Sequence, residues 1–303
     1  MSAVPVAIAP ELDEHLVAAV EGAGGKVVGL DEARVLVWIG VPADFPELGD
    51  HIEWVALKSA GIEDFFAAGV LDDRRIWTNA SGFYAENVAE HALALLLAGL
   101  RQINTAVVRH WDKERIDTSV RTLRGATVGI IGAGGIGASL APRLKACGAR
   151  VVAVNRSGRE VPGADVVRRS SELGSLWGSF DHVVLAAPAT AETRHMINSE
   201  TLAALPEHAW IVNVARGPLV DEEALHRALV DGVIAGAALD VTDPEPPAAD
   251  NPLWSLPNVI ITPHVANPAS GLTREFAPWL AENLRRFSAG EELLARVAPD
   301  RNY

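Results

Sequence analysis

Short runs of consecutive apolar residues, rather than alternating ones, dominate the hydrophobic pattern of this chain. In the first hundred residues they occur at VPVAIAP, KVVGL, RVLVWIG and IEWVALKSAG, with a helical pattern over residues 13–22. Short aliphatic runs separated by helices are typical of parallel strands that are buried on both faces. The N-terminal region is therefore predicted to be an α/β layer.

From Thr127 onward the same pattern becomes more regular. Strands are predicted at TVGII, RVVAV, HVVLAA, WIVNV, VIAGAALD and NVIIT, with helices between them. This indicates a second parallel sheet, of six strands, and an α/β fold with two Rossmann-like domains. The proline-rich segment 243–257 lies between two of these strands and is interpreted as an ordered loop.

Polar residues and glycines follow the predicted strands of this second sheet. Ligands of open parallel sheets bind beyond the carboxyl ends of the strands, so these residues are expected to share one edge and form a site. In chain order they are Gly132, Asn155-Arg156, Pro188, Ala215-Arg216, Asp240 and Pro263-His264.

A glycine pattern, G-x-G-x-x-G, occupies the first of these strand ends. Gly132, Gly134 and Gly137 directly follow a strand and open a helix, and a second strand comes about 20 residues later. The three glycines allow a tight turn, close approach of a pyrophosphate and close helix–strand packing. The turn predicts a dinucleotide cofactor bound at a helix N-terminus.

The end of the next strand bears on which dinucleotide binds. NAD-type sites place Asp or Glu there, whereas this chain has Asn155, Arg156 and Ser157, with Arg159 nearby. Without a carboxylate, a 2′-phosphate is not repelled, and Arg156 can pair with it. NADP(H) is therefore predicted over NAD(H); the alternative is that Arg156 only stacks over the adenine.

Three residues at the same edge match the chemistry of carbonyl reduction. His264 is the histidine that follows a strand at its carboxyl end, and histidine is suited to proton transfer near neutral pH. Glu245, held in the stiff DPEPP segment, is the candidate carboxylate that favours the imidazolium form. Arg216 has the planar fork that binds a carboxylate or polarises a carbonyl oxygen.

The overall composition excludes several classes of function. The net charge of −13 over 303 residues argues against a nucleic-acid partner. The single cysteine, Cys147, gives no disulfide framework and no cysteine zinc site, and no metal is predicted. The longest apolar run, ALALLLAGL, is about half a membrane span. No signal peptide is evident, so a cytoplasmic protein is expected.

Five motifs together resemble the D-isomer-specific 2-hydroxyacid dehydrogenase family. They are GATVGIIGAGGIG, NVARGPLVDEEAL, GAALDVTDPEPP, NPLWSLPNVIITPHVA and NVAEHALALLLAGLRQ. The resemblance, to the glyoxylate/hydroxypyruvate reductase-like or short phosphoglycerate dehydrogenase-like forms, implies reduction of a 2-keto acid to a D-2-hydroxy acid, or the reverse. It implies that His264 is the general acid/base, that Glu245 supports it and that Arg216 binds the substrate. Asp240 would contact the nicotinamide carboxamide.

The resemblance also implies two sets of binding residues. The substrate would contact Ser59, Ala60, Gly61, Ile62, Arg216 and His264. The cofactor would contact Gly132, Gly134, Gly135, Ile136, Gly137, Asn155, Arg156, Ser157, Ala187, Pro188, Thr193, Val214, Ala215, Arg216, Asp240, His264 and Ala266. Departures from the family pattern at KSAGIEDFF, TNASGFYAENVAEH and VANPASGLT border the substrate pocket, so the substrate is not predicted; Trp54, Phe83 and Tyr84 are its aromatic candidates.

The family architecture is discontinuous. Residues 1–97 and 273–303 are predicted to form the substrate domain, and residues 98–272 the dinucleotide-binding domain. The helix Glu86–Arg101 is apolar nearly all round, which predicts burial against a second subunit and a homodimer; burial between the two domains of one chain is the alternative.

Two other functions fit parts of this pattern. A dinucleotide-binding sensor or corepressor-like module would use the same scaffold, and relatives of that kind retain the same three polar residues. A formate or phosphite dehydrogenase-like enzyme is the second alternative. An assay for turnover of 2-keto acids distinguishes the sensor or corepressor-like module from an enzyme.

Overall fold

The computed structural model describes residues 3–109, 111–267 and 271–297. Parts of the predicted domain segments, at residues 1–2, 110, 268–270 and 298–303, lie outside the described residues. The chain divides into two compact units, one formed by residues 1–84 and 268–303 and the other by residues 85–267. The unit changes between residues 84 and 85 and again between residues 267 and 268. The predicted crossings, near 98 and 273, each lie C-terminal to the corresponding change.

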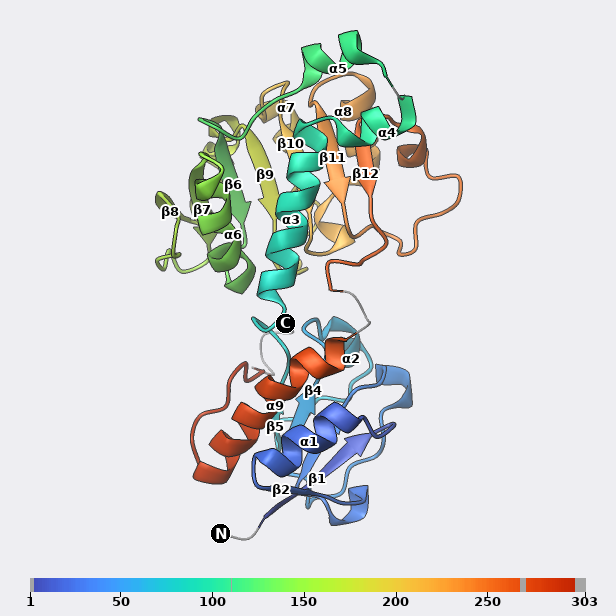
Figure 1. Cartoon of the computed structure of the whole chain (residues 1–303), viewed down its shortest axis with the longest axis vertical. Coiled ribbons are helices and arrows are strands. Elements are labelled where there is room, and N and C mark those ends of the chain that lie inside the picture. Colours follow the sequence, from blue (N-terminus) through green and yellow to red (C-terminus); the bar gives the residue numbers. More distant parts are fainter. Residues whose placement is uncertain (1–2, 110, 268–270, 298–303) are drawn as a thin grey trace. The chain divides into compact units, whose positions relative to one another are not determined.

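The first unit contains a parallel sheet with the strand order β2-β1-β3-β4-β5. Its core includes the fully buried indoles of Trp54 and Trp77. Helices α1 and α9, from opposite ends of the chain, pack side by side (Figure 1), and a Cβ on Gly25 would come within 2.9 Å of Leu284 on α9. The elements are β1 (Val4–Ala9), α1 (Glu14–Gly22), β2 (Gly25–Val27), β3 (Val35–Trp38), β4 (Trp54–Leu57), α2 (Glu63–Ala67), β5 (Ile76–Thr78) and α9 (Leu272–Ala289).

The second unit contains a parallel sheet of seven strands in the order β12-β11-β10-β9-β6-β7-β8. The order reverses between β6 and β9, which is where open α/β sheets bind ligands. The strands are β6 (Thr127–Ile131), β7 (Arg150–Asn155), β8 (Val166–Arg169), β9 (His182–Leu185), β10 (Trp210–Asn213), β11 (Gly236–Leu239) and β12 (Val259–Ile261). The helices are α3 (Ala85–Leu100), α4 (Ile103–Arg109), α5 (Lys113–Ser119), α6 (Gly135–Ala146), α7 (Ser199–Ala204) and α8 (Glu222–Val230).

These two sheets confirm the predicted α/β fold, with one correction to the number of strands. The sequence pattern predicted six strands in the second sheet and missed β8. This strand lies at the edge of the sheet, and its last two residues, Arg168 and Arg169, are exposed. A half-buried edge strand lacks the continuous apolar run by which the central strands are recognised. The sequence pattern also missed β5, in the first sheet, because this strand has only three residues.

Helix α3 belongs to the second unit because it packs on the sheet of that unit. Together with α6 it lies over the sheet (Figure 1), and it contacts β10, β11 and β12. The contact with β10 is close, because a Cβ on Gly99 would lie 2.3 Å from the indole of Trp210. Gly236 on β11 presses on the same indole, at 2.4 Å for an added Cβ. The C-terminal part of α3, at Gly99, is therefore packed closely against the sheet of this unit.

No single helix among the described residues has both the length and the apolar composition to cross a membrane. Helices α3 and α4 reach these values only as a pair, which is bent by 57°.

Candidate active site

The glycine turn between β6 and α6 has the backbone that its sequence requires. Gly132 has φ +86°, and a Cβ there would lie 2.3 Å from the backbone of Ala187, which follows β9. At Gly137 a Cβ would come within 2.7 Å of Ala133. The turn is thus pressed against the point where the strand order reverses.

The space in front of this turn fits a dinucleotide pyrophosphate. A Cβ on Gly134 would meet nothing nearer than the Gly132 oxygen, at 3.9 Å. Gly135 and Ile136 begin α6, and the first N–H groups of a helix have no partner within the helix. The residues present therefore offer open backbone N–H groups and a positive helix end to a phosphate group.

Asn155, at the end of β7, holds the following loop together. Its side-chain amide donates to the carbonyl oxygen of Arg159 (2.9 Å), and its side-chain oxygen accepts from the backbone N–H of Arg159 (3.1 Å). The hydroxyl of Ser157 also lies 3.3 Å from this oxygen. The polar atoms of Asn155 are therefore used within the loop, and no carboxylate stands at the end of this strand.

The next loop, after β9, is fixed by its threonine. Thr193 donates its hydroxyl to the Pro188 carbonyl oxygen (2.7 Å) and accepts from the backbone N–H of Thr190 (2.8 Å). These bonds close the segment 188–193 into a turn directly after Ala187. The predicted positions Val214 and Ala215, after β10, are both buried.

The turn that carries Arg216 is built by Asn213 and Gly217. Asn213, which is fully buried, donates to the Arg216 carbonyl oxygen (2.9 Å) and accepts from the backbone N–H of Ala215 (3.0 Å). A Cβ on Gly217 would lie 1.9 Å from the Thr242 carbonyl oxygen, so only glycine fits. The Arg216 turn is consequently in contact with the start of the proline-rich segment.

The proline-rich segment is anchored by Glu222, the first residue of α8. One of its carboxylate oxygens accepts from the backbone N–H of Asp243 (2.9 Å) and the other from the side chain of Asn251 (2.9 Å). Proline donates no backbone hydrogen bond, so the segment takes its anchoring from these bonds and from Thr242, which donates to the Pro244 carbonyl oxygen. Glu245 is thereby held in a defined place.

Glu245 and His264 form a hydrogen-bonded pair. The distance from His264 Nδ1 to Glu245 Oε1 is 2.6 Å, and the two side chains are 49 % and 42 % exposed. His264 has φ +51°, which is uncommon for a residue other than glycine. With Nδ1 bonded to the carboxylate, Nε2 is the ring nitrogen left for a reacting molecule.

Asp240 holds the loop that carries His264. Its buried carboxylate accepts hydrogen bonds from the Thr262 hydroxyl (2.6 Å) and from the backbone N–H groups of Val265 and Ala266 (both 3.0 Å). His91 on α3 lies 3.2 Å away. Burial alone would raise the pKa of Asp240, but the bonds from His91, Thr262 and the backbone outweigh it and lower the pKa to about 2.

His91 is a further polar residue of this edge, and the sequence motifs did not single it out. The ring contacts both Asp240 and Thr262 (3.1 Å to the hydroxyl), so α3 is tied to the His264 loop. The available indication was a polar side chain inside an apolar helix, since a buried polar group needs a partner. His208, outside this loop, pairs with Asp181 at 2.7 Å.

The predicted substrate loop, Ser59–Ile62, lies in the first unit between β4 and α2. Its carbonyl groups are used: Asn79 donates to Ala60 (2.7 Å) and Ala80 to Ser59 (2.9 Å). Tyr84 donates to the preceding carbonyl, that of Lys58 (2.9 Å). Within the described residues the N–H groups of Ala60, Gly61 and Ile62 have no acceptor. Adjacent free N–H groups of this kind are suited to binding an anion.

The three aromatic candidates for the substrate pocket differ in their surroundings. Trp54 is fully buried in β4 and donates to the Thr78 hydroxyl (2.9 Å), so it belongs to the core and not to a pocket. Phe83 is half-buried and contacts Tyr84, with 4.8 Å between ring centres.

In the part of the chain that the structure describes, no three His, Cys, Asp or Glu side chains are grouped as metal ligands.

The fold and these strand-end residues define the class of the protein, a Rossmann-type dinucleotide-dependent oxidoreductase. Comparison with known proteins gives the family. Residues 92–266 match the family described as D-isomer specific 2-hydroxyacid dehydrogenase, NAD binding domain. The chain therefore belongs to the D-isomer-specific 2-hydroxyacid dehydrogenases, as its motifs predicted, and it interconverts 2-keto acids and D-2-hydroxy acids with NAD(P).

Individual relatives extend this result over nearly the whole chain. A glyoxylate reductase of Korarchaeum cryptofilum is 38% identical over 88% of this chain and 82% of its own. A D-isomer specific 2-hydroxyacid dehydrogenase of Xanthobacter autotrophicus Py2, solved with NADPH and MES, is 31% identical, covers all of both chains and has a TM-score of 0.82. An NADPH-dependent glyoxylate/hydroxypyruvate reductase of Sinorhizobium meliloti, solved with NADP and sulfate, is 27% identical with a TM-score of 0.82, over 99% of this chain and 100% of its own.

Proposed function

We propose that this protein reduces a small 2-keto acid, with His264 as the general acid and Glu245 as the group that orients it. The observation that carries the proposal is the 2.6 Å bond between His264 Nδ1 and Glu245, which leaves Nε2 to give its proton to the carbonyl oxygen. A nicotinamide dinucleotide, which the glycine turn at Gly132 and Gly134 would hold, would supply the hydride chemistry. In the reverse direction the same nitrogen takes the proton from the hydroxyl group.

Two further groups are proposed to hold the substrate. The Arg216 guanidinium, on the turn fixed by Asn213, binds the carboxylate and the keto oxygen through its planar fork. The free N–H groups of Ala60, Gly61 and Ile62 bind the carboxylate as well. The carbonyl groups of Ala60 and Ile62 already accept hydrogen bonds, which leaves the N–H side of the loop for an anion.

The substrates named for the relatives define the compounds to assay. We propose glyoxylate and hydroxypyruvate as the first substrates to test, in a panel with larger 2-keto acids. Turnover of at least one of them with NADPH or NADH supports the enzyme. Cofactor binding with no turnover on the whole panel would instead support the sensor or corepressor-like alternative, and turnover of formate or phosphite the other alternative. The comparisons favour neither of these two.

We also propose that NADPH is preferred over NADH. The side chain of Asn155 is hydrogen-bonded within the loop 155–159, and an asparagine carries no negative charge at the strand end proposed to bind the ribose. Arg156 and Arg159 add positive charge to the same loop. The NADPH- and NADP-bound relatives agree with this preference.

The test of this preference is a comparison of kcat/KM for the two cofactors. Arg156→Ala should lower kcat/KM for NADPH by about tenfold or more, the usual value of a hydrogen bond between charged groups, and leave NADH nearly unchanged. Arg150→Ala, at the start of β7, is the matched control. Equal losses for both cofactors would support stacking of Arg156 over the adenine instead.

A homodimer is proposed from the surface next to α3. Four large apolar side chains there are more than half exposed: Ile103, Val107, Val108 and Trp111, the last at 90 %. Contiguous exposed apolar side chains mark interaction surfaces. We expect a dimer in analytical ultracentrifugation that Val108→Glu converts to monomer, whereas Val41→Glu, at an exposed valine of the first unit, leaves it intact. A monomeric wild-type protein would contradict the proposal.

A further inference from the structure

The seven-stranded sheet has a second cluster of polar side chains at its opposite edge, where the strands begin. Here β6, β9 and β10 start at Thr127, His182 and Trp210. A pocket of about 540 Å³ opens beside these strand starts. Besides backbone and apolar atoms it is lined by Arg101, Arg121, Thr122, Asp181, His182 and His208. None of these residues belongs to the site described above.

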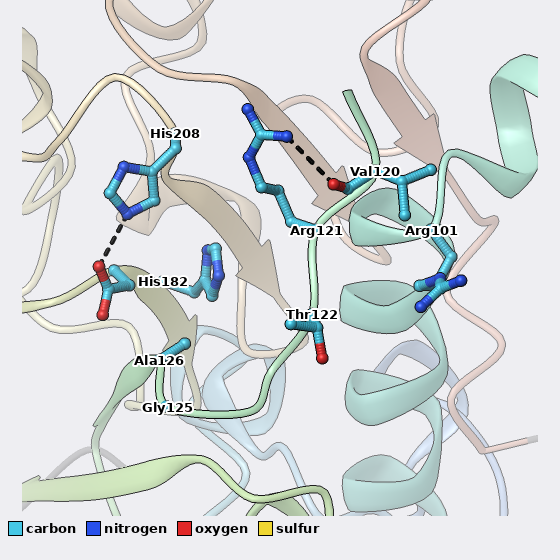
Figure 2. Close-up of a pocket in the computed structure, with 9 residues that line it drawn as sticks. Arg101, Val120, Arg121, Thr122, Gly125, Ala126, His182 and His208 are labelled. Atoms are coloured by element: carbon cyan, nitrogen blue, oxygen red, sulfur yellow. Dashed lines mark hydrogen bonds and ion pairs between the residues drawn. The ribbon is translucent and has the colours of Figure 1, made fainter. Parts of the chain in front are cut away.

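His182 brings a buried donor to this pocket. Its side chain is 2 % exposed, and its Nδ1 accepts a hydrogen bond from the backbone N–H of Trp210 (3.2 Å). Because Nδ1 is an acceptor, the ring proton is on Nε2. Nε2–H has no acceptor among the described residues, so it can donate to a molecule in the pocket. In Figure 2 the ring of His182 stands between His208 and the loop that carries Arg121 and Thr122.

Arg121 brings a positive charge that no carboxylate of the described chain neutralises. One of its terminal nitrogens donates to the carbonyl oxygens of Thr118 and Val120 (both 3.0 Å), which fixes the guanidinium and leaves its other N–H groups unused. Figure 2 shows this guanidinium projecting beside His208. Arg101 also lines the pocket and lies on the far side of Thr122 from His182, so it adds charge rather than a direct contact.

The acidic residue of the pocket is occupied by its own partners. Asp181 accepts hydrogen bonds from the backbone N–H of Thr127 (2.7 Å) and from His208 (2.7 Å). Two arginines thus face one aspartate that is already bonded, in a chain whose net charge is −13. Fixed donors and unneutralised guanidinium groups are what a small anion needs.

We propose that this pocket binds a compact oxyanion, with Arg121 and the Nε2–H of His182 as its hydrogen-bond donors. The ligand is a phosphate or sulfate-like group, either free or at the end of a small metabolite. Since the pocket lies at the starts of the strands and the cofactor turn at their ends, this ligand would be an effector and not a substrate.

The binding is tested by calorimetric titration with inorganic phosphate in the presence of saturating NADPH, which keeps phosphate out of the cofactor site. Arg121→Gln should weaken phosphate binding about tenfold or more, because it removes a charged donor. Arg124→Gln, which changes the same charge three residues away and outside the pocket lining, should alter the affinity less than twofold. Equal affinities in the two variants would overturn the proposal.

A second measurement tests His182 without relying on a variant that could fail to fold. Phosphate should shift the ¹⁵N resonance of His182 Nε2 in the wild type and in Arg124→Gln, and shift it much less in Arg121→Gln. A His182 resonance that does not respond would also overturn the proposal. Titrations with sulfate, malonate and a sugar phosphate separate the sources: a tighter sugar phosphate points to a metabolite, and equal phosphate and sulfate to a free ion. Malonate binding tighter than phosphate would contradict the assigned chemistry.

Discussion

Two histidine–carboxylate pairs lie at opposite edges of the seven-stranded sheet, and their geometry is nearly the same. His264 and Glu245 are 2.6 Å apart at the carboxyl ends of the strands, and His208 and Asp181 are 2.7 Å apart at the amino ends. Both pairs are about half exposed. The pair alone therefore does not define a catalytic site.

The difference lies in what surrounds each pair. His264 is on a loop held by the buried Asp240 and shares its edge with the glycine turn and Arg216. His208 lies beside a pocket with arginines at the edge where no cofactor turn is found. Position relative to the strand ends, more than the distance within the pair, decides which histidine can act on a substrate.

Removal of the ring at the carboxyl edge should give the largest effect. His264→Ala is expected to lower kcat by about 10²–10⁴-fold, the usual contribution of a positioned acid or base, with the affinity for the cofactor nearly unchanged. Steady-state kinetics and a fluorescence titration of NADPH measure the two quantities. His226→Ala, on α8, is the control. Near-normal turnover of His264→Ala would show that the histidine at the carboxyl edge is not the general acid/base.

Asp240, which holds the His264 loop, should contribute more to stability than Asp181 at the amino edge. Asp240→Ala leaves the N–H groups of Val265 and Ala266 without an acceptor, so the free energy of unfolding should fall by about 3 kcal/mol. Asp181→Ala, at a partly exposed carboxylate, should cost about half as much. Urea denaturation of both variants measures these changes, and equal losses would show that the two aspartates are equivalent.

At the amino edge, the buried histidine should make stability depend on pH. Burial lowers the pKa of His182 to about 4. Below pH 6.5 the unfolded chain takes up a proton that the folded chain does not, so stability is lost as the pH falls from 6.5 towards 4. This group should remove about 2 kcal/mol between pH 7 and pH 5. Wild type and His182→Gln are compared by denaturation at both pH values; parallel losses would contradict the assignment.

The smallest effect is expected for the exposed pair at the amino edge. His208→Ala should lower the free energy of unfolding by no more than about 1 kcal/mol at low salt, and by less at high salt, because both side chains are partly exposed to solvent. Thermal denaturation at two salt concentrations measures this change. A loss that does not depend on salt would indicate that His208 acts by packing and not by charge.

The sequence predicted the central strands of both sheets, because buried parallel strands are continuous apolar runs. It also predicted that Gly132, Arg216, Glu245 and His264 lie at one edge, because the carboxyl ends of parallel strands meet at the same edge of a sheet. It missed β5 and β8, which are short or exposed. The contact of His91 with Thr262 could not be predicted from the sequence either. His91 and Thr262 are 171 residues apart in the chain, and no local pattern joins them.

The contact of Trp210 with Gly99 and Gly236 constrains how this protein can change. Each glycine leaves room for the same buried indole, because a Cβ added at Gly99 or Gly236 would lie 2.3 or 2.4 Å from that ring. A smaller residue at 210 would remove this restriction at both positions at once. Alanine at position 99 or 236 should thus be rejected alone and tolerated with a smaller residue at 210, and a library that varies the three positions together would recover folded proteins that single changes at the glycines do not reach.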